Sequence, residues 1–204
     1  AGFSIVKWEG SGVATSVPHG LSTTPDLVIV KRLDGTTNWQ TWYTGAGTSP
    51  GSGINRVYLN TTDDNDSSTT NVFYPDATKI NLNSGDHFFN SSGSDYIAYC
   101  WHSVTGYSKI GTFTGSSSAK TVTTGFQPDF VMIKRTIGGD EEWNIIDSVR
   151  GGDRRLKADS TAAEVDESSD YVTFAATSFT ITVTGNASLN NNGDTFLYVA
   201  FKIN

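Results

Sequence analysis

The stretch PDLVIVKR at residues 25–32 decides the fold, because the chain contains it twice. Residues 128–135 read PDFVMIKR, which differs only where one apolar residue replaces another. A repeat spaced by about 100 residues indicates a chain built from two similar halves. We expect the first half to span residues 1–104 and the second residues 105–204. We also expect the halves to pack as one compact unit.

Other segments recur in the same order. Both halves carry Asn-x-x-Gly before their last apolar stretch, at Asn90 and Asn190. The remaining matched pairs are FSIVKWEG with YSKIGTFTG, NWQTWY with EWNIID, RVYLN with RRLKAD, KINLN with residues 179–183, and YIAYCWH with the TFLYVAFK segment.

Composition favours strands over helices. The chain is 36% hydrophobic, 17% charged and 12% aromatic, with 21 glycines and many Ser and Thr residues, a profile typical of short strands joined by polar turns. We count seven or eight strands in each half. The sequence therefore predicts an all-β protein, an antiparallel β-sandwich built from two internally repeated halves of about 100 residues.

Four strands should be central in their sheets. Within residues 96–102, Ile97, Tyr99 and Trp101 point to one face and the small or aromatic residues between them to the other. Residues 196–201 and the two PDLVIVKR-type strands are likewise apolar on both faces, so both faces should be covered. The cover is either a packed second sheet with long loops, or another subunit.

The basic pairs that end these strands should reach water. We expect Lys31, Arg32, Lys134 and Arg135 to leave the core with packed stems and solvated heads. Each motif starts with Pro, at a strand entry where no ladder donor is needed. The motif is therefore interpreted as structural.

The charge and the apolar pattern of the sequence argue against several kinds of protein and partner. A net charge of −7 with scattered basic residues argues against nucleic-acid binding. No apolar run is long enough to suggest membrane insertion. The only methionine is Met132, so Ala1 is expected to result from processing or from excision from a longer chain. With one cysteine, Cys100, an internal disulfide is excluded.

Aromatic residues give the first candidate binding surface. Trp39 and Trp143 occupy equivalent places, which favours core packing over an exposed sugar-stacking platform. Trp42 and Tyr43 have no aromatic counterparts in the second half, so we predict that they form an exposed binding surface. Trp101 matches Phe201 and is predicted to lie in the core.

Two loops differ between the halves. Arg150, Arg154 and Arg155 flank a Gly-rich segment that is either a specificity loop or a simple connector. Asp63, Asp64 and Asp66 form an acidic loop that is a weak calcium candidate. The spacing of a calcium-binding EF-hand loop is missing, and a solvated loop is the alternative.

Residue patterns point to no catalytic site and no cofactor. His19, His87 and His102 lie far apart without metal-ligand spacing, and Cys100 matches Ala200, as suits a small buried thiol. Paired carboxylates for glycoside hydrolysis could come from distant strands, but no pair is selected. We expect no enzymatic activity.

The whole pattern resembles an uncharacterised tandem-repeat β family of structural and tail-fibre-type proteins from marine bacteriophages, including cyanophages. The resemblance rests on FSIVKWEGSG, YIAYCWHSVTGYSKIGTFTGS, TGFQPDFVMIKRT and NNNGDTFLYVAFK, spread over nearly the whole chain. The acidic loop of residues 63–66 departs from it. The family provides no activity or binding residues that can be transferred.

The resemblance implies a non-enzymatic virion component: a tail fibre, a receptor-binding domain or a capsid decoration. Its expected partners are further copies of itself, other virion proteins and a host-surface glycan or protein, engaged by multivalent non-covalent binding. The alternative function is a carbohydrate-binding module of a secreted bacterial protein.

Overall fold

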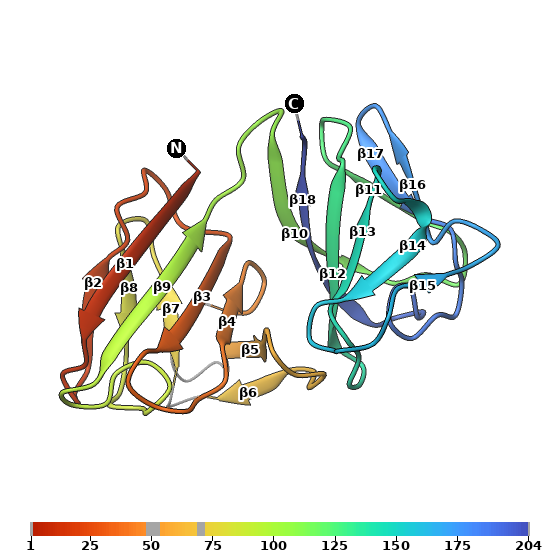
Figure 1. Cartoon of the computed structure of the whole chain (residues 1–204). Coiled ribbons are helices and arrows are strands. Elements are labelled where there is room, and N and C mark those ends of the chain that lie inside the picture. Colours follow the sequence, from red (N-terminus) through yellow and green to blue (C-terminus); the bar gives the residue numbers. More distant parts are fainter. Residues whose placement is uncertain (1, 48–53, 69–71, 204) are drawn as a thin grey trace. The chain divides into compact units, whose positions relative to one another are not determined.

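The computed structural model describes residues 2–47, 54–68 and 72–203 (Figure 1). This part of the chain contains eighteen strands, no helix and therefore no helix that could cross a membrane. It forms two compact units. Unit 1 comprises residues 1–60 and 65–102, and unit 2 comprises residues 61–64 and 103–204.

Unit 1 contains one six-stranded and one three-stranded antiparallel sheet. The six-stranded sheet has the order β1-β9-β3-β4-β5-β6, and the three-stranded sheet the order β2-β8-β7. The strands are β1 (Phe3–Glu9), β2 (Thr15–Pro18), β3 (Leu27–Arg32), β4 (Gln40–Tyr43), β5 (Ile54–Tyr58), β6 (Asp66–Ser68), β7 (Phe73–Pro75), β8 (Lys79–Leu82) and β9 (Asp95–Trp101).

Each of the two sheets of unit 2 has the same strand order as the corresponding sheet of unit 1. They run β10-β18-β12-β13-β14-β15 and β11-β17-β16. The strands are β10 (Ser108–Thr114), β11 (Lys120–Thr123), β12 (Phe130–Ile137), β13 (Asn144–Asp147), β14 (Gly151–Lys157), β15 (Val165–Asp166), β16 (Val172–Ala175), β17 (Ser178–Ile181) and β18 (Thr195–Phe201). The expected antiparallel all-β architecture is confirmed.

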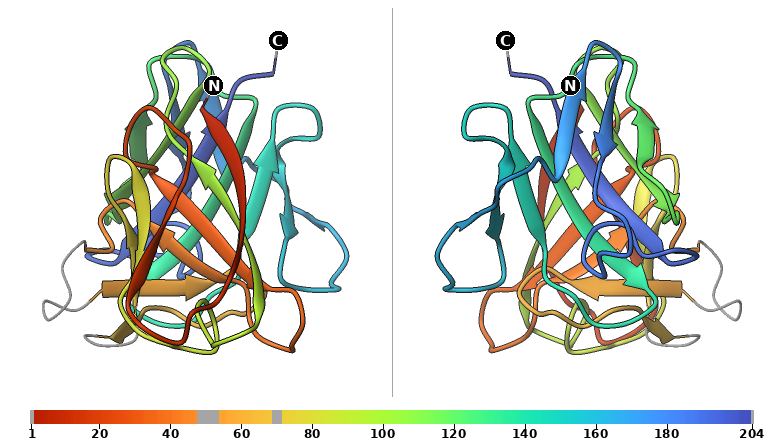
Figure 2. Two further views of the ribbon diagram at one scale, coloured as in Figure 1. Left: turned by 90° about the vertical axis from the view of Figure 1, so that its left-hand side faces the viewer. Right: turned by 90° about the vertical axis from the view of Figure 1, so that its right-hand side faces the viewer.

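In each unit the two sheets pack as a sandwich (Figures 1 and 2). The core of unit 2 joins Val131 and Ile133 of β12 to Val122 of β11 and Phe179 of β17. In unit 1 the inner face carries Trp8, whose indole stacks on Tyr96 with ring centroids 5.6 Å apart. Alternation along each strand places these side chains inside and their neighbours on the outer face of the six-stranded sheet.

The two PDLVIVKR-type strands, β3 and β12, are interior strands of their sheets, as predicted, and so are β9 and β18. The expectation of cover on both faces holds for β3, whose Leu27 and Ile29 are buried as well as Val28 and Val30. For β9 it is wrong. Its outward residues Ile97, Tyr99 and Trp101 are only half-buried.

A buried asparagine closes each sandwich. The Asn90 Oδ1 accepts from the Ser11 backbone N–H at 2.9 Å, and its Nδ2 donates to the carbonyls of Val13 and Ser84 at 2.7 and 2.8 Å. Asn190 makes the same three bonds in unit 2. We call each set an asparagine clasp. It explains why Asn-x-x-Gly recurs in the sequence.

A glycine stands against each clasp. A Cβ on Gly10 would lie 2.1 Å from the Ser91 carbonyl oxygen, and one on Gly115 would lie 2.0 Å from that of Asn191. No side chain fits at such distances, so the strand end and the clasp loop require glycine here. These glycines end the two matched segments, FSIVKWEG and YSKIGTFTG.

The basic pairs at the strand ends differ from the prediction in unit 2. Lys134 is 0% exposed, and its ammonium donates to the carbonyls of Thr62 at 2.7 Å and Glu141 at 2.5 Å. Arg135 is also buried and is paired with Asp194 at 2.6 Å. The expected solvated heads are therefore wrong for this pair, because Thr62, Glu141 and Asp194 supply acceptors for them inside unit 2.

Candidate functional site

Trp42 and Tyr43 do not form an exposed surface. They are 3% and 1% exposed. Trp42 pairs with Val28 and shares its inward orientation, and its indole N–H donates to the Gly47 carbonyl at 2.9 Å. The prediction of an exposed aromatic pair is therefore corrected: the apolar bulk of Trp42 belongs to the core of unit 1.

The arginines of the Gly-rich segment are engaged by acids of unit 2. The Arg150 guanidinium lies 2.6 Å from Asp147 and 2.9 Å from Glu164. Arg154 lies 3.0 Å from Glu164 and 2.9 Å from Asp166. These pairs lower the pKa of Glu164, mainly through hydrogen bonds from the two arginines. The network ties β14 to the segment that leads into β15.

Arg155 has a different environment. Its guanidinium lies over the Tyr171 ring, 4.8 Å from the centroid, and donates to Asn144 Oδ1 at 3.1 Å. A cation over an aromatic face is stabilised by the quadrupole of the ring. All three arginines therefore have structural partners, and this geometry favours the connector interpretation over a specificity loop.

The acidic loop is divided between the units. Asp63 and Asp64 belong to unit 2, where burial lowers the pKa of Lys134 and their charges partly offset that shift. Asp63 accepts from the Thr61 hydroxyl at 2.9 Å. The side chain of Asp66 lies outside the described part. Among the residues that are described, no group of three His, Cys, Asp or Glu side chains could hold a metal ion.

The remaining candidates lie in separate settings. His19 is buried in a turn, where its Nδ1 accepts from the Leu21 N–H at 3.1 Å. His87 is exposed beside Phe88. Cys100 is fully buried, and burial raises the pKa of its thiol to about 12. The predicted small buried thiol is confirmed.

The outer face of the unit 1 sheet carries four neighbouring aromatic rings, which we call the aromatic strip: Phe3, Trp39, Tyr99 and Trp101. Tyr99 and Trp101 are outward residues of β9, and register places Phe3 of β1 opposite Trp101. Trp39 precedes β4. Phe3 is 42% exposed, and the other three residues are half-buried.

Neighbouring rings of the aromatic strip are stacked or tilted against one another. Ring centroids are 4.9 Å apart for Phe3 and Trp101, 6.2 Å for Trp101 and Tyr99, and 6.5 Å for Tyr99 and Trp39. The interplanar angles of these pairs are 33°, 28° and 24°. Contacts between aromatic rings are favourable and help to hold the rings in place. The result is a row of contacting, partly exposed rings on the outer face of the sheet.

Two sequence predictions are corrected by the strip. Trp143 is fully buried as expected, but its counterpart Trp39 is not. Trp101, predicted to lie in the core, faces outward. A signal was present: alternation already grouped Tyr99 with Trp101, and the second half has Val199 where Tyr99 stands. An interpretation in which both faces are covered does not single out this group.

A polar pocket of about 320 Å³ lies beside the strip in unit 1. Its lining residues are Thr36, Thr37, Asn38, Asn60, His87 and Phe88. Asn60 connects the pocket to the strip, because its Oδ1 accepts the Trp39 backbone N–H at 2.9 Å. Its Nδ2 donates to Asn38 Oδ1 at 3.0 Å. Hydroxyl, amide and aromatic groups therefore converge at one end of the strip.

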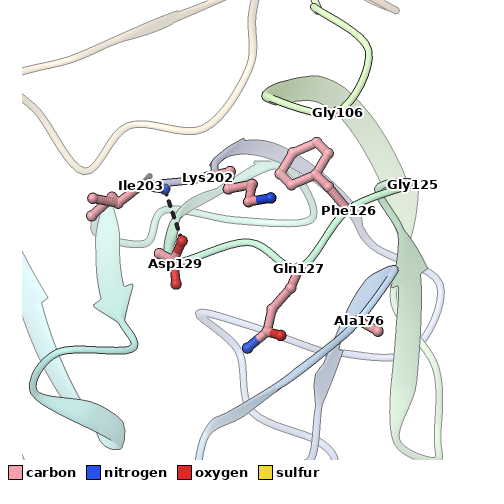
Figure 3. A pocket seen from close by; sticks show the side chains of 8 residues that line it. All are labelled: Gly106, Gly125, Phe126, Gln127, Asp129, Ala176, Lys202 and Ile203. Carbon is pink, nitrogen blue, oxygen red and sulfur yellow. Dashed lines mark hydrogen bonds between the residues drawn. The ribbon is translucent and has the colours of Figure 1, made fainter.

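Unit 2 has a larger pocket of about 590 Å³, shown in Figure 3. Asp129 is held there by the Ile203 N–H at 2.8 Å and the Ser148 hydroxyl at 3.1 Å. Gln127 points away from Phe126 in this view, and Lys202 reaches toward the Phe126 ring. Lys202 is exposed, and the Asp129 carboxylate already accepts hydrogen bonds within the protein. These groups do not indicate a particular ligand, so we assign no function to this pocket.

Comparison with known families gave a match to a domain of unknown function (DUF7483) over residues 1–204. The chain belongs to this family. The DUF7483 match covers both units, so the two sandwiches lie within one family domain. Neither the curated proteins nor the solved structures gave a match.

Proposed function

We propose that this DUF7483 chain is a non-enzymatic structural or adhesive module whose unit 1 binds a glycan surface non-covalently through the aromatic strip. The observation that carries the proposal is the row of contacting, partly exposed rings on the outer face of the sheet around β9. Exposed apolar patches of this kind commonly mark interaction sites.

A sugar chain fits this surface chemically. One face of a pyranose ring presents C–H groups with partial positive charge, and an aromatic face is negative, so the two attract. Tyr99 and Trp101 are held by backbone pairing to β1 and β3, which keeps the ring planes in place before binding. Preorganisation lowers the entropy cost of association. A row of partly exposed rings suits a linear or surface-bound glycan.

The biological setting of the proposal rests on the sequence resemblance. A tail fibre, receptor-binding domain or capsid decoration would present several copies of unit 1 on a virion, in a homo-oligomer with other virion proteins. Weak binding to a host-surface glycan is then multiplied by copy number. Nucleic-acid binding and membrane insertion have no place in this proposal.

The test is retention on a panel of immobilised polysaccharides. Wild-type protein should be retained on at least one, and Tyr99→Val, which introduces the residue found at this place in unit 2, should lose about tenfold in affinity. Tyr107→Val is the matched control, since Tyr107 is an exposed aromatic of unit 2. Equal retention of Tyr99→Val and wild type would remove the strip from the mechanism.

The same site would serve a carbohydrate-binding module of a secreted bacterial protein. One strip is sufficient for a monomer to bind a polysaccharide, which favours this second candidate if no oligomer forms. Light scattering distinguishes the two. A stable oligomer supports the virion module, and a monomer that binds a defined polysaccharide supports the carbohydrate-binding module.

A further inference from the structure

The polar pocket at the end of the aromatic strip has the properties of a sugar subsite. We propose that it receives the terminal, uncharged sugar residue of a glycan chain whose following residues lie on the strip. This inference rests on the proposed function and makes it more specific: unit 1 recognises chain ends. The pocket volume, about 320 Å³, is at the small end of the range for ligand sites.

The first argument is continuity. Asn38 lines the pocket and is followed directly by Trp39, whose ring stacks on Tyr99. Asn60 receives the Trp39 N–H and donates to Asn38, so both amides are fixed relative to the strip. A ligand that lies on Tyr99 and Trp39 therefore has the pocket directly beside it, on residues linked to Trp39 through the chain and through Asn60.

The second argument is that the pocket residues have hydrogen-bond donors and acceptors that are not used within the protein. No described residue accepts from Asn38 Nδ2, and Thr36 has no hydrogen-bond partner in the described part. Thr37 Oγ1 accepts from Lys31 Nζ at 3.4 Å, which leaves its own hydroxyl hydrogen to donate. Amides and hydroxyls that both donate and accept match sugar hydroxyl groups, which do the same.

The third argument is charge and shape. The six described lining residues include no Asp, Glu, Lys or Arg, so the walls themselves are those expected for a neutral sugar. Phe88 provides an apolar wall and is held by His87, 4.2 Å away between ring centroids, and by Arg56, 5.8 Å from its ring. A neutral sugar, with apolar C–H groups and polar hydroxyls, satisfies both kinds of wall.

Unit 2 shows why the arrangement is specific to unit 1. There Asp159 stands where Asn60 stands, accepting the Trp143 N–H at 3.2 Å. Trp143 is fully buried and unavailable for stacking. Burial raises the pKa of the Asp159 carboxyl. The same backbone position therefore serves internal structure in one unit and a ligand-accessible wall in the other.

The experiment compares chain ends with chain interiors. Cellohexaose, maltohexaose and mannohexaose are titrated against the full chain by calorimetry, beside the retention assay on intact polysaccharides. Asn38→Asp keeps the acceptor used by Asn60 but replaces the free amide with a charge. We expect it to weaken hexaose binding at least tenfold and polysaccharide retention less than twofold. Tyr99→Val should weaken both.

His87→Ala is a second pocket variant, chosen because His87 is exposed, and thermal unfolding confirms that each variant folds. Unchanged hexaose affinity in both pocket variants overturns the inference. So does wild-type binding to polysaccharide without binding to any hexaose. If wild type binds neither polysaccharide nor hexaose, the proposed function fails, and the subsite fails with it.

Discussion

Units 1 and 2 share a backbone frame but differ on the outer faces of their large sheets. Where unit 1 has Phe3 opposite Trp101, unit 2 has Ser108 opposite Phe201. The outward residue next along the central strand is a half-buried Tyr99 in unit 1 and a buried Val199 in unit 2. The inner cores, the clasps and the strand orders correspond. One face of the fold can therefore change its chemistry without loss of the frame.

The equivalent lysines give the same lesson on a smaller scale. Lys31 is half-buried and donates to the carbonyls of Arg32 and Gly35 within its own turn. Lys134 is buried, and its ammonium donates a hydrogen bond to the carbonyl of Thr62, a residue distant in sequence. The local motif thus determines the position of the lysine at the end of its strand. Residues distant in sequence determine whether its ammonium group is exposed to water.

The largest expected effect is a difference in stability loss between alanine variants of the two equivalent tryptophans, Trp143 and Trp39. Trp143→Ala removes a fully buried indole and should lower the free energy of unfolding by about 4 kcal/mol. Trp39→Ala should cost less than about 2 kcal/mol, because the ring is only half-buried, yet abolish glycan retention. Urea denaturation and the retention assay measure both. Equal stability losses would contradict the assigned difference between the units.

The asparagine clasps should behave alike. Asn90→Ala and Asn190→Ala each remove the three hydrogen bonds of a clasp, so each should cost about 3 kcal/mol in the free energy of unfolding. Urea denaturation measures both losses. Asn192→Ala, at an exposed site in the same loop, is the control and should change little. A large loss in only one clasp variant would show that the two frames are not equivalent.

The buried Lys134 predicts a rise of stability with pH. Burial lowers its pKa from 10.5 to about 8, partly offset by Asp159, Asp140, Asp63 and Asp64. Between those values the unfolded state holds the proton and the folded state does not, so the free energy of unfolding increases with pH, by up to about 3 kcal/mol.

The measurement is urea denaturation at pH 7.5 and 10.5 for wild type and Lys134→Met. Wild type should gain stability relative to the variant over this interval. Lys109→Met, at an exposed site of β10, controls for other titrating groups and should follow wild type. Parallel pH profiles for wild type and Lys134→Met would contradict a lowered pKa.

The smallest effect is expected for Arg154→Ala. Its ion pairs with Glu164 and Asp166 are partly exposed and screened by solvent. Its stability loss should be smaller than those above and should diminish as salt is raised. Thermal unfolding at low and high ionic strength measures this. A loss that is insensitive to salt would mean that the side chain acts through packing.

Much of the frame could be predicted because its causes are local. The strands β3 and β12, their entry prolines and the recurring Asn-x-x-Gly each follow from short patterns of apolar and turn residues. The clasp partners could not be predicted. Ser11 and Ser84 reach Asn90 only through the folded sandwich.

The site was harder to predict for a physical reason. Which of Trp42 and Tyr43 faces the core depends on the register of a four-residue strand, and both proved buried. Tyr99 lies in a strand that is apolar on both faces, and composition does not reveal how fully the outer face is covered. The buried Lys134 donates to the carbonyls of Thr62 and Glu141, and no pattern near the motif indicates these acceptors.

The pairing of β1 with β9 has a mechanical consequence. The strands are antiparallel, and the His102 N–H donates to the Gly2 carbonyl, so the two ends of unit 1 lie side by side. Lys202 and Tyr107 do the same in unit 2. A pulling force on these ends loads the ladder one hydrogen bond at a time instead of shearing all of them together. Each unit therefore yields from its ends inward, and β1 and β10 peel away before β3 and β12.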